Sequence, residues 1–264
     1  MAAVSEPASR TPIVCVDECA VAAAVLFDPN PWSGNTKGLI QSCWSEYSVL
    51  HHCTSQIVAT CKESKSLCAR HITKVENQWT EKKFDLEKVI IFGQEPDLHL
   101  LIEAFFSGVK SLLDLLVQLL SSGGIVNTKI DGFHRNKDIY GGTVLNALEN
   151  NVPTAKKDAA AKFRVLISAN KTKWIDQAIS ARDLLVHPEK GMFQLMFMLE
   201  FIERNGKLVC VEAHPPAIGG ERIDQYAQHV LEDVDRFTSE FIRLLGEISV
   251  TNNREQPMPT DERG

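Results

Sequence analysis

Hydrophobic positions recur every three to four residues over most of this chain, a spacing that predicts a mainly helical protein. A first amphipathic helix is expected to begin at Asn35, a residue suited to capping, and to continue to about Trp79. A second helix is expected from about Pro96 to the stop at Gly123-Gly124. It is apolar on most sides, so it should be largely buried.

The remainder of the chain alternates helical and extended patterns. Helices are expected at about 143–151, from Pro153 to Val186 with a break near residue 170, and at about 222–248. Before the last helix the hydrophobic spacing becomes extended on both sides of Asn205-Gly206. An Asn-Gly pair in that position predicts a β-hairpin with a type I′ turn.

These patterns divide the chain into three parts. Residues 1–34 are interpreted as an N-terminal arm, and residues 251–264 as a disordered tail. Residues 35–250 are interpreted as one helical domain with a long first helix and a hairpin at about 193–213. A helix of about 45 residues, together with several apolar segments, favours a homodimer.

Composition limits the classes of function. The 264 residues are 44% hydrophobic, which is enough for a substantial core. A formal charge of −6 and a pI near 5.8 provide no overall basic field for holding nucleic acid. A local basic cleft remains compatible with these values, because net charge describes the whole molecule and not one site.

The cysteines indicate a reducing compartment. Their number is seven, which is odd, and no CxxC pair or secretory leader occurs, so the expected location is the cytoplasm, without a membrane segment. The His and Cys residues between 51 and 71 spread along one predicted helix and should not converge on a metal ion. No metal and no cofactor are therefore expected, and Walker, GxGxxG, HExxH and GxSxG motifs are absent.

The segment Arg182-Asp183-Leu-Leu-Val-His187, followed by Pro188, is the strongest candidate for chemistry. Asp183 and His187 are four residues apart, so in a helix the carboxylate can hydrogen-bond the imidazole and fix its tautomer. Pro188 disfavours the helical conformation of His187, which loosens the last turn and allows the imidazole to approach Arg182.

This motif resembles that of the HEPN superfamily, which is an Arg, a polar residue, three further residues and a His. The resemblance covers Arg182, Asp183 and His187 in an all-helical context. It implies a HEPN-like helical bundle, a homodimer with two motifs across a shared cleft, and metal-independent endoribonuclease activity. The family also suggests roles in toxin, stress or defence systems, with an antitoxin or another protein as a possible partner.

The implied reaction is chemically coherent. Metal-free RNA cleavage uses the 2′-hydroxyl as nucleophile and requires a base, an acid and positive charge at the phosphate. His187 is the expected acid and base, Arg182 the phosphate clamp, and Asp183 the residue that orients the imidazole. The alternative for this motif is ordinary surface charge and a basic group that complements the helix dipole.

Two further basic segments are weaker candidates for RNA contacts. His134, Arg135 and Lys137 lie in a glycine-flanked loop, and Lys156 and Lys157 precede the motif on the same helical stretch. Each set also fits solvated charge on an exposed loop or helix face. The alternative function, which the acidic pI favours, is a non-catalytic homodimeric module that binds a protein partner or a nucleotide.

Overall fold

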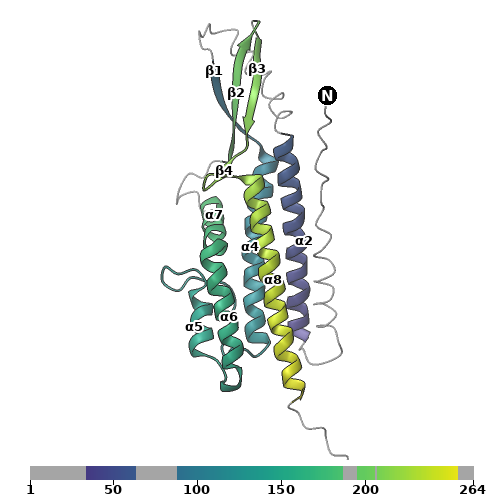
Figure 1. The fold of residues 1–264 in the computed structure, drawn as a ribbon, viewed down its shortest axis with the longest axis vertical. Coiled ribbons are helices and arrows are strands. Elements are labelled where there is room, and N and C mark those ends of the chain that lie inside the picture. The colour runs from purple at the N-terminus through teal and green to yellow at the C-terminus, as the bar shows by residue number, and fades with distance from the viewer. Residues whose placement is uncertain (1–33, 64–87, 187–194, 206, 255–264) are drawn as a thin grey trace, which may run out of the picture.

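The computed structural model describes residues 34–63, 88–186, 195–205 and 207–254. The predicted N-terminal arm therefore lies outside the described residues, except for Gly34. The described chain is mainly helical, as predicted, and is built from a long helical bundle with a small sheet at one end (Figure 1).

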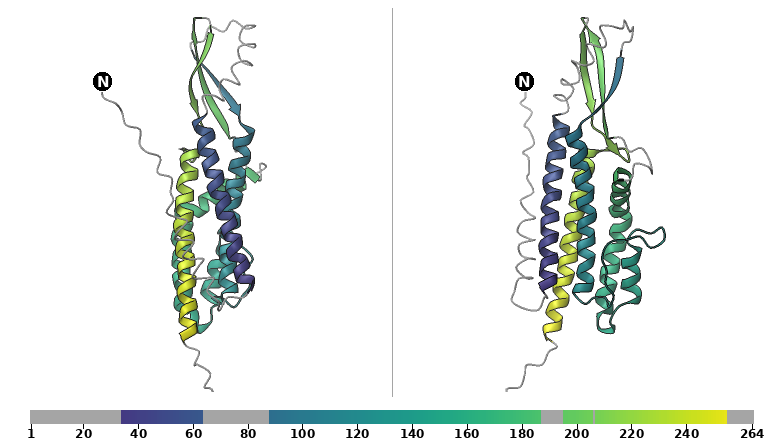
Figure 2. Two further views of the ribbon diagram at one scale, coloured as in Figure 1. Left: turned by 90° about the vertical axis from the view of Figure 1, so that its right-hand side faces the viewer. Right: turned by 180° about the vertical axis from the view of Figure 1, so that it is seen from behind.

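Three long helices form one side of the bundle. Helix α2 (Gly34–Lys62) packs against α4 (Pro96–Ser122) and α8 (Ile223–Arg254). Their contact faces are apolar, and the side chains at Leu50, Ile102 and Phe241 are completely buried. Figure 2 shows the three helices running side by side.

The ends of α2 and α8 differ from the boundaries predicted from the sequence. Helix α2 ends at Lys62 and Glu63 forms a turn, whereas the sequence pattern predicted helix to about Trp79; residues 64–87 lie outside the described part. The disordered tail was predicted from residue 251, but α8 continues to Arg254, so this boundary was wrong by four residues. The last residues, 255–264, are not described.

The second side of the bundle is a stretch of successive helices. Helix α5 (Gly142–Asn150) is followed by the 3₁₀ turn η1 (Thr154–Lys156), α6 (Lys157–Asn170), the π-helical segment η2 (Lys171–Ile175) and α7 (Asp176–Val186). Helix α6 packs on α5 and α8, and α7 packs on α4.

The π-helical segment occurs at the break that was predicted near Asn170. The amide oxygen of Asn170 accepts a hydrogen bond of 2.9 Å from the indole of Trp174. This buried indole packs edge-on against Phe237 of α8, with ring centroids 6.0 Å apart. The indole of Trp174, which lies in this wider turn, thus points into the core.

The sheet lies beyond the ends of the long helices (Figures 1 and 2). Strands β2 (Met196–Arg204) and β3 (Lys207–His214) form the predicted hairpin, and Asn205 has the positive φ, 55°, expected in its turn. Strand β1 (Lys88–Gln94), which was not predicted, pairs antiparallel with β2 and adds a third strand. A two-residue pair, β4 (Ala217–Ile218) and β5 (Glu221–Arg222), leads into α8.

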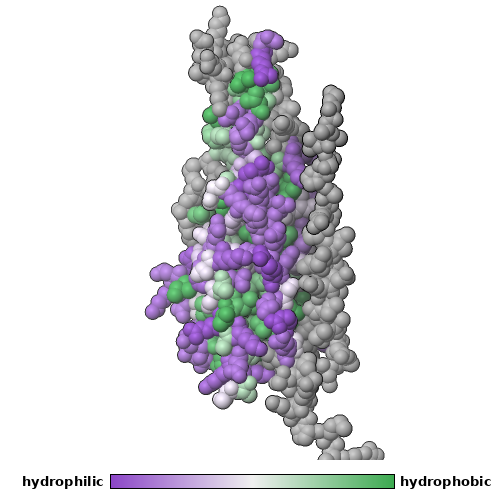
Figure 3. Space-filling model, viewed as in Figure 1, coloured by the Kyte–Doolittle hydropathy of each residue, from purple (hydrophilic) through white to green (hydrophobic). Residues whose placement is uncertain are grey.

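The two faces of the sheet differ in exposure. Phe197, Leu199 and Phe201 of β2 are buried on one face. On the other face Ile90 and Phe92 are 49% and 62% exposed, and hydrophobic surface is visible over the sheet in Figure 3. Within the described residues, no helix combines the length and hydrophobicity needed to cross a membrane.

Candidate anion-binding site at the end of helix α7

The predicted motif lies at the end of α7. Arg182 and Asp183 are in its last turns, with side chains 29% and 21% exposed, and the Arg182 guanidinium donates a 3.2 Å hydrogen bond to Asp183 Oδ1. The helix ends at Val186, the residue predicted from the sequence. His187 lies outside the described residues, so its pairing with Asp183 stays a prediction.

A loop from a distant part of the chain completes the surroundings of Asp183. The hydroxyl of Tyr140 donates a 3.0 Å hydrogen bond to Asp183 Oδ2, and an Arg135 nitrogen lies 3.6 Å from the same oxygen. The Arg135 guanidinium also stacks on the Tyr140 ring, 3.8 Å from its centroid. We call Arg135, Tyr140, Arg182 and Asp183 the Asp183 cluster.

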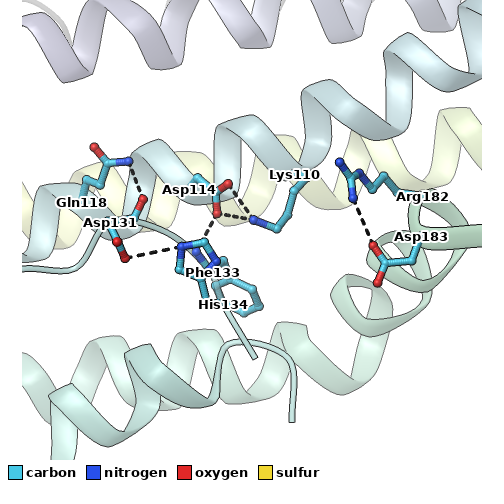
Figure 4. Close-up of polar contacts among 8 residues, drawn as sticks. All are labelled: Lys110, Asp114, Gln118, Asp131, Phe133, His134, Arg182 and Asp183. Carbon is cyan, nitrogen blue, oxygen red and sulfur yellow. Dashed lines mark hydrogen bonds and ion pairs between the residues drawn. The ribbon is translucent and has the colours of Figure 1, made fainter. Parts of the chain in front are cut away.

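Helix α4 holds this loop in place (Figure 4). Asp114 Oδ1 accepts hydrogen bonds from the Phe133 backbone amide, at 2.6 Å, and from Lys110, at 2.5 Å. Gln118, one turn further along, donates to the Asp131 carbonyl at 3.0 Å. The loop is therefore fixed to α4 at residues just before Arg135 in the sequence, and Arg135 then faces α7.

Two glycines allow the loop to pack this closely. Gly141 has φ +66°, and a Cβ there would overlap the ring of Phe133, which is almost fully buried. A Cβ on Gly132 would lie 2.8 Å from His134 Nε2 and 2.9 Å from Asp114 Oδ1. Gly141 therefore requires the absence of a side chain, whereas a side chain at Gly132 would force His134 and Asp114 to shift.

The other predicted loop residues lie near the cluster in sequence but make different contacts. His134 is exposed, and its Nε2 lies 3.4 Å from Asp131 Oδ1. Lys137 is exposed in a left-handed conformation with φ 55°. Among the described residues, the hydrogen bonds and ion pairs of the Asp183 cluster include neither side chain.

Lys156 and Lys157 lie far from the cluster. They stand where α6 begins, and the helical stretch from Lys157 to Arg182 contains 25 residue steps. At 1.5 Å per residue this places Lys157 about 37 Å from Arg182 along the helices. Lys156 and Lys157 are therefore not part of the Asp183 cluster, and their contact with RNA stays a prediction.

The Asp183 cluster carries a local positive charge. Two guanidiniums face one carboxylate, which leaves a net charge of about +1 in a molecule whose net charge is −6. Burial, together with the hydrogen bond to Asp183, raises the pKa of Tyr140, so its phenol remains a donor at neutral pH. Arg182 Nε is buried and has no hydrogen-bond partner among the described residues.

The described cysteines of helix α2 lie in the core of the bundle. Cys43, Cys53 and Cys61 are buried in the core, and burial raises the pKa values of Cys43 and Cys61 to about 12. Such thiols are poor metal ligands, since the thiolate is the form that binds. A group that the sequence did not predict as a site, Glu200, Glu212 and His214, is brought together by strands β2 and β3.

Comparison with known proteins gives no match. No family model, no curated protein and no solved structure resembles the chain significantly. The functional interpretation of the Asp183 cluster therefore depends on its own geometry and on the residues of the motif.

Proposed function

We propose that this protein binds and cleaves RNA at the Asp183 cluster, as a metal-independent endoribonuclease of the HEPN type. The observation that carries the proposal is the arrangement of two guanidiniums on either side of Asp183, next to the position of His187 in the chain. A phosphodiester requires positive charge beside it and a proton-transferring group within reach.

Arg182 and Arg135 have the properties of phosphate ligands. A guanidinium is always charged, and its planar set of N–H donors matches the oxygens of a phosphate. The Arg182 and Arg135 side chains are 29% and 49% exposed, so each is accessible from solvent. A bound phosphate would add a second acceptor to guanidiniums that Asp183 already orients.

The geometry favours a different role for Asp183 from the predicted one. Its Oδ1 accepts the bond from Arg182, and its Oδ2 contacts Tyr140 and Arg135. We propose that Asp183 positions the two arginines, and that any contact with His187 shares an oxygen with one of these partners. The carboxylate is then a positioning residue.

His187 is the proposed proton-transfer residue. In the proposed reaction, the imidazole removes the 2′-hydroxyl proton, the oxygen attacks the adjacent phosphorus, and the 5′-oxygen leaves with a proton from a second imidazolium. A homodimer would supply that second imidazole from the partner's motif. The same proposal places the protein in the cytoplasm, in a toxin, stress or defence role with a protein partner such as an antitoxin.

The test is cleavage of mixed-sequence RNA by the purified protein in excess EDTA. We expect cleavage of RNA but not of the matching DNA, because DNA lacks the 2′-hydroxyl. His187→Ala should abolish cleavage. Arg182→Lys should reduce it strongly while retaining charge, because lysine lacks the planar fork.

Arg222→Lys is the matched control. Arg222 is also an exposed arginine beside a carboxylate, with two hydrogen bonds of 3.1 and 3.0 Å to Asp224, but it lies at the end of β5, directly before α8. Its replacement should leave cleavage unchanged. Equal cleavage by wild type and by folded His187→Ala would exclude the proposed mechanism.

One observation favours the second candidate, a non-catalytic module that binds a protein or a nucleotide. Each guanidinium of the Asp183 cluster already has an acidic partner within the chain, as in a purely structural ion pair. In that case RNA would remain intact. Anisotropy of a labelled nucleotide or RNA oligomer, measured with wild type and Arg135→Ala, would then detect binding without cleavage.

A further inference from the structure

A second cluster of chemically active side chains lies on the exposed face of the sheet. It consists of Glu200 on β2 and of Glu212 and His214 on β3, and we call it the His214 cluster. His214 Nε2 lies 3.9 Å from Glu200 Oε1 and 3.6 Å from Glu212 Oε2. All three ligand atoms lie within 4.8 Å of one another.

A β-bulge creates this arrangement. From the turn to Phe201, β2 and β3 pair in one register, with Phe201 opposite Cys210. The register then shifts, so that Glu200 pairs with Glu212 and not with Val211. Without the extra residue, Glu212 would stand opposite Leu199, on the buried face of the sheet.

The bulge thus moves Glu212 and His214 together onto the face that carries Glu200. Bulges that redirect a side chain in this way are over-represented next to functional sites. This observation is independent of the distances within the cluster, because it concerns the backbone pairing alone.

The spacing of the ligand atoms fits a small metal ion. Nitrogen and carboxylate oxygen bind Zn²⁺ at about 2.0 to 2.2 Å, so tetrahedral ligand atoms are separated by about 3.4 Å. The two distances from His214, 3.6 and 3.9 Å, are close to this value before any adjustment to an ion. The Glu212 side chain is 62% exposed, which leaves it room to rotate toward an ion.

Charge in the cluster favours a cation. Glu200 and Glu212 are directly opposite each other, and like charges in cross-strand pairs are destabilising. Glu200 is only 16% exposed, which limits its screening by water. With a neutral imidazole the cluster has a charge of about −2, which a divalent ion would neutralise.

We propose that the His214 cluster binds one divalent first-row transition-metal ion, such as Zn²⁺, through one imidazole and two carboxylates. The imidazole selects this class of ion over Mg²⁺ and Ca²⁺, which prefer oxygen ligands. Three protein ligands leave a coordination position for water. The ion fixes β3 to β2 across the bulge, and this site is independent of the proposed RNA cleavage.

The test is titration of the full-length protein with Co²⁺, followed by competition with Zn²⁺. Co²⁺ bound to nitrogen and oxygen gives visible absorption bands, without the intense charge-transfer band that thiolates add. We expect one Co²⁺ per chain at this site, displaced by Zn²⁺. His214→Ala should weaken binding by about tenfold or more, since even loss of a group that only supports a ligand has that effect.

Glu200→Gln and Glu212→Gln retain the side-chain shape and should also weaken binding. His229→Ala is the matched control, because His229 is an exposed imidazole paired with one carboxylate, Glu221, at 2.5 Å. The His229→Ala variant should bind Co²⁺ with the same affinity as wild type. If the three cluster variants bind the ion like wild type, or if wild type shows only thiolate bands, the contacts are ion pairs of a protonated His214 and the metal site is excluded.

Discussion

The Asp183 cluster and the His214 cluster have opposite compositions. At the end of α7 one carboxylate is shared by two guanidiniums, whereas on the sheet one imidazole faces two carboxylates. The first leaves a surplus of positive charge and suits an anion such as phosphate. The second leaves a surplus of negative charge and suits a metal cation.

The two clusters also differ in how the fold brings their side chains together. The Asp183 cluster joins a helix end to a loop that is fixed by Asp114 and by close packing at Gly141. The His214 cluster depends on one extra residue in a β-ladder. Neither surplus is visible in the net charge of −6, which describes the whole molecule.

The largest expected effect comes from adding one methyl group to the loop. Gly141→Ala should destabilise the protein by about 3 kcal/mol or more, because left-handed backbone strain adds to overlap with the buried Phe133. It should also displace Arg135 and Tyr140 from Asp183. Chemical denaturation measures the stability change, and a loss of the proposed RNA cleavage would report the displaced cluster.

Gly124→Ala is the control for strain alone. Gly124 has almost the same φ, +67°, but a Cβ there meets no atom within 4 Å. It should lose only about 1 to 2 kcal/mol, the usual cost of a left-handed residue with a side chain. Equal losses in both variants would show that Phe133 does not determine the packing of the loop.

Much of the bundle was predictable because its signals are local. The helical spacing predicted α4, α5, α6 and α8 to within a few residues, apart from the end of α8. The break near Asn170 was confirmed as the π-helical segment, and the Asn205-Gly206 pair predicted the hairpin. Each of these features depends on residues close together in the sequence.

The sites depend on contacts that a local pattern does not encode. Arg135 was predicted as a weak candidate from its loop, but its approach to Asp183 joins segments more than 40 residues apart. The Glu200–Glu212 pairing was missed because a hairpin of unshifted register puts Val211 opposite Glu200. The β-bulge determines this pairing, and the residue types around it do not predict a bulge.

The second prediction tests whether the single carboxylate stabilises its two partners. Asp183→Asn should destabilise the protein by about 2 kcal/mol, because two charge-assisted contacts lose their charge in a partly buried place. Thermal or chemical denaturation measures this loss. Asp131→Asn is the control, since Asp131 is exposed and pairs only with His134 among the described residues.

The third prediction concerns Tyr140. Tyr140→Phe removes one hydrogen bond to Asp183 and should cost about 1 kcal/mol at neutral pH. Because the folded state raises the pKa of this phenol, its contribution is complete below the unfolded value near 10 and is lost as pH rises through the folded value. The stability difference between wild type and Tyr140→Phe should therefore shrink in alkaline solution.

Tyr226→Phe is the control for the hydrogen bond between Tyr140 and Asp183. Burial raises the pKa of Tyr226 as well, but its hydroxyl has no hydrogen-bond partner among the described residues. Removing it should cost less at neutral pH than removing the Tyr140 hydroxyl. A larger loss from Tyr226→Phe would contradict the stabilising role of the Tyr140–Asp183 bond.

The fourth prediction concerns Glu212, whose replacement should have a small stabilising effect. Glu212→Gln, without added metal, should stabilise the protein by about 0.5 kcal/mol, because it removes one of two like charges that face each other across the strands. In saturating Zn²⁺ the order should reverse, since wild type gains more from binding the ion than the variant does. Thermal denaturation in EDTA and in Zn²⁺ measures the stability difference in both conditions. If Glu212→Gln destabilises the protein in EDTA, the charges of the two carboxylates are already compensated by a protonated His214.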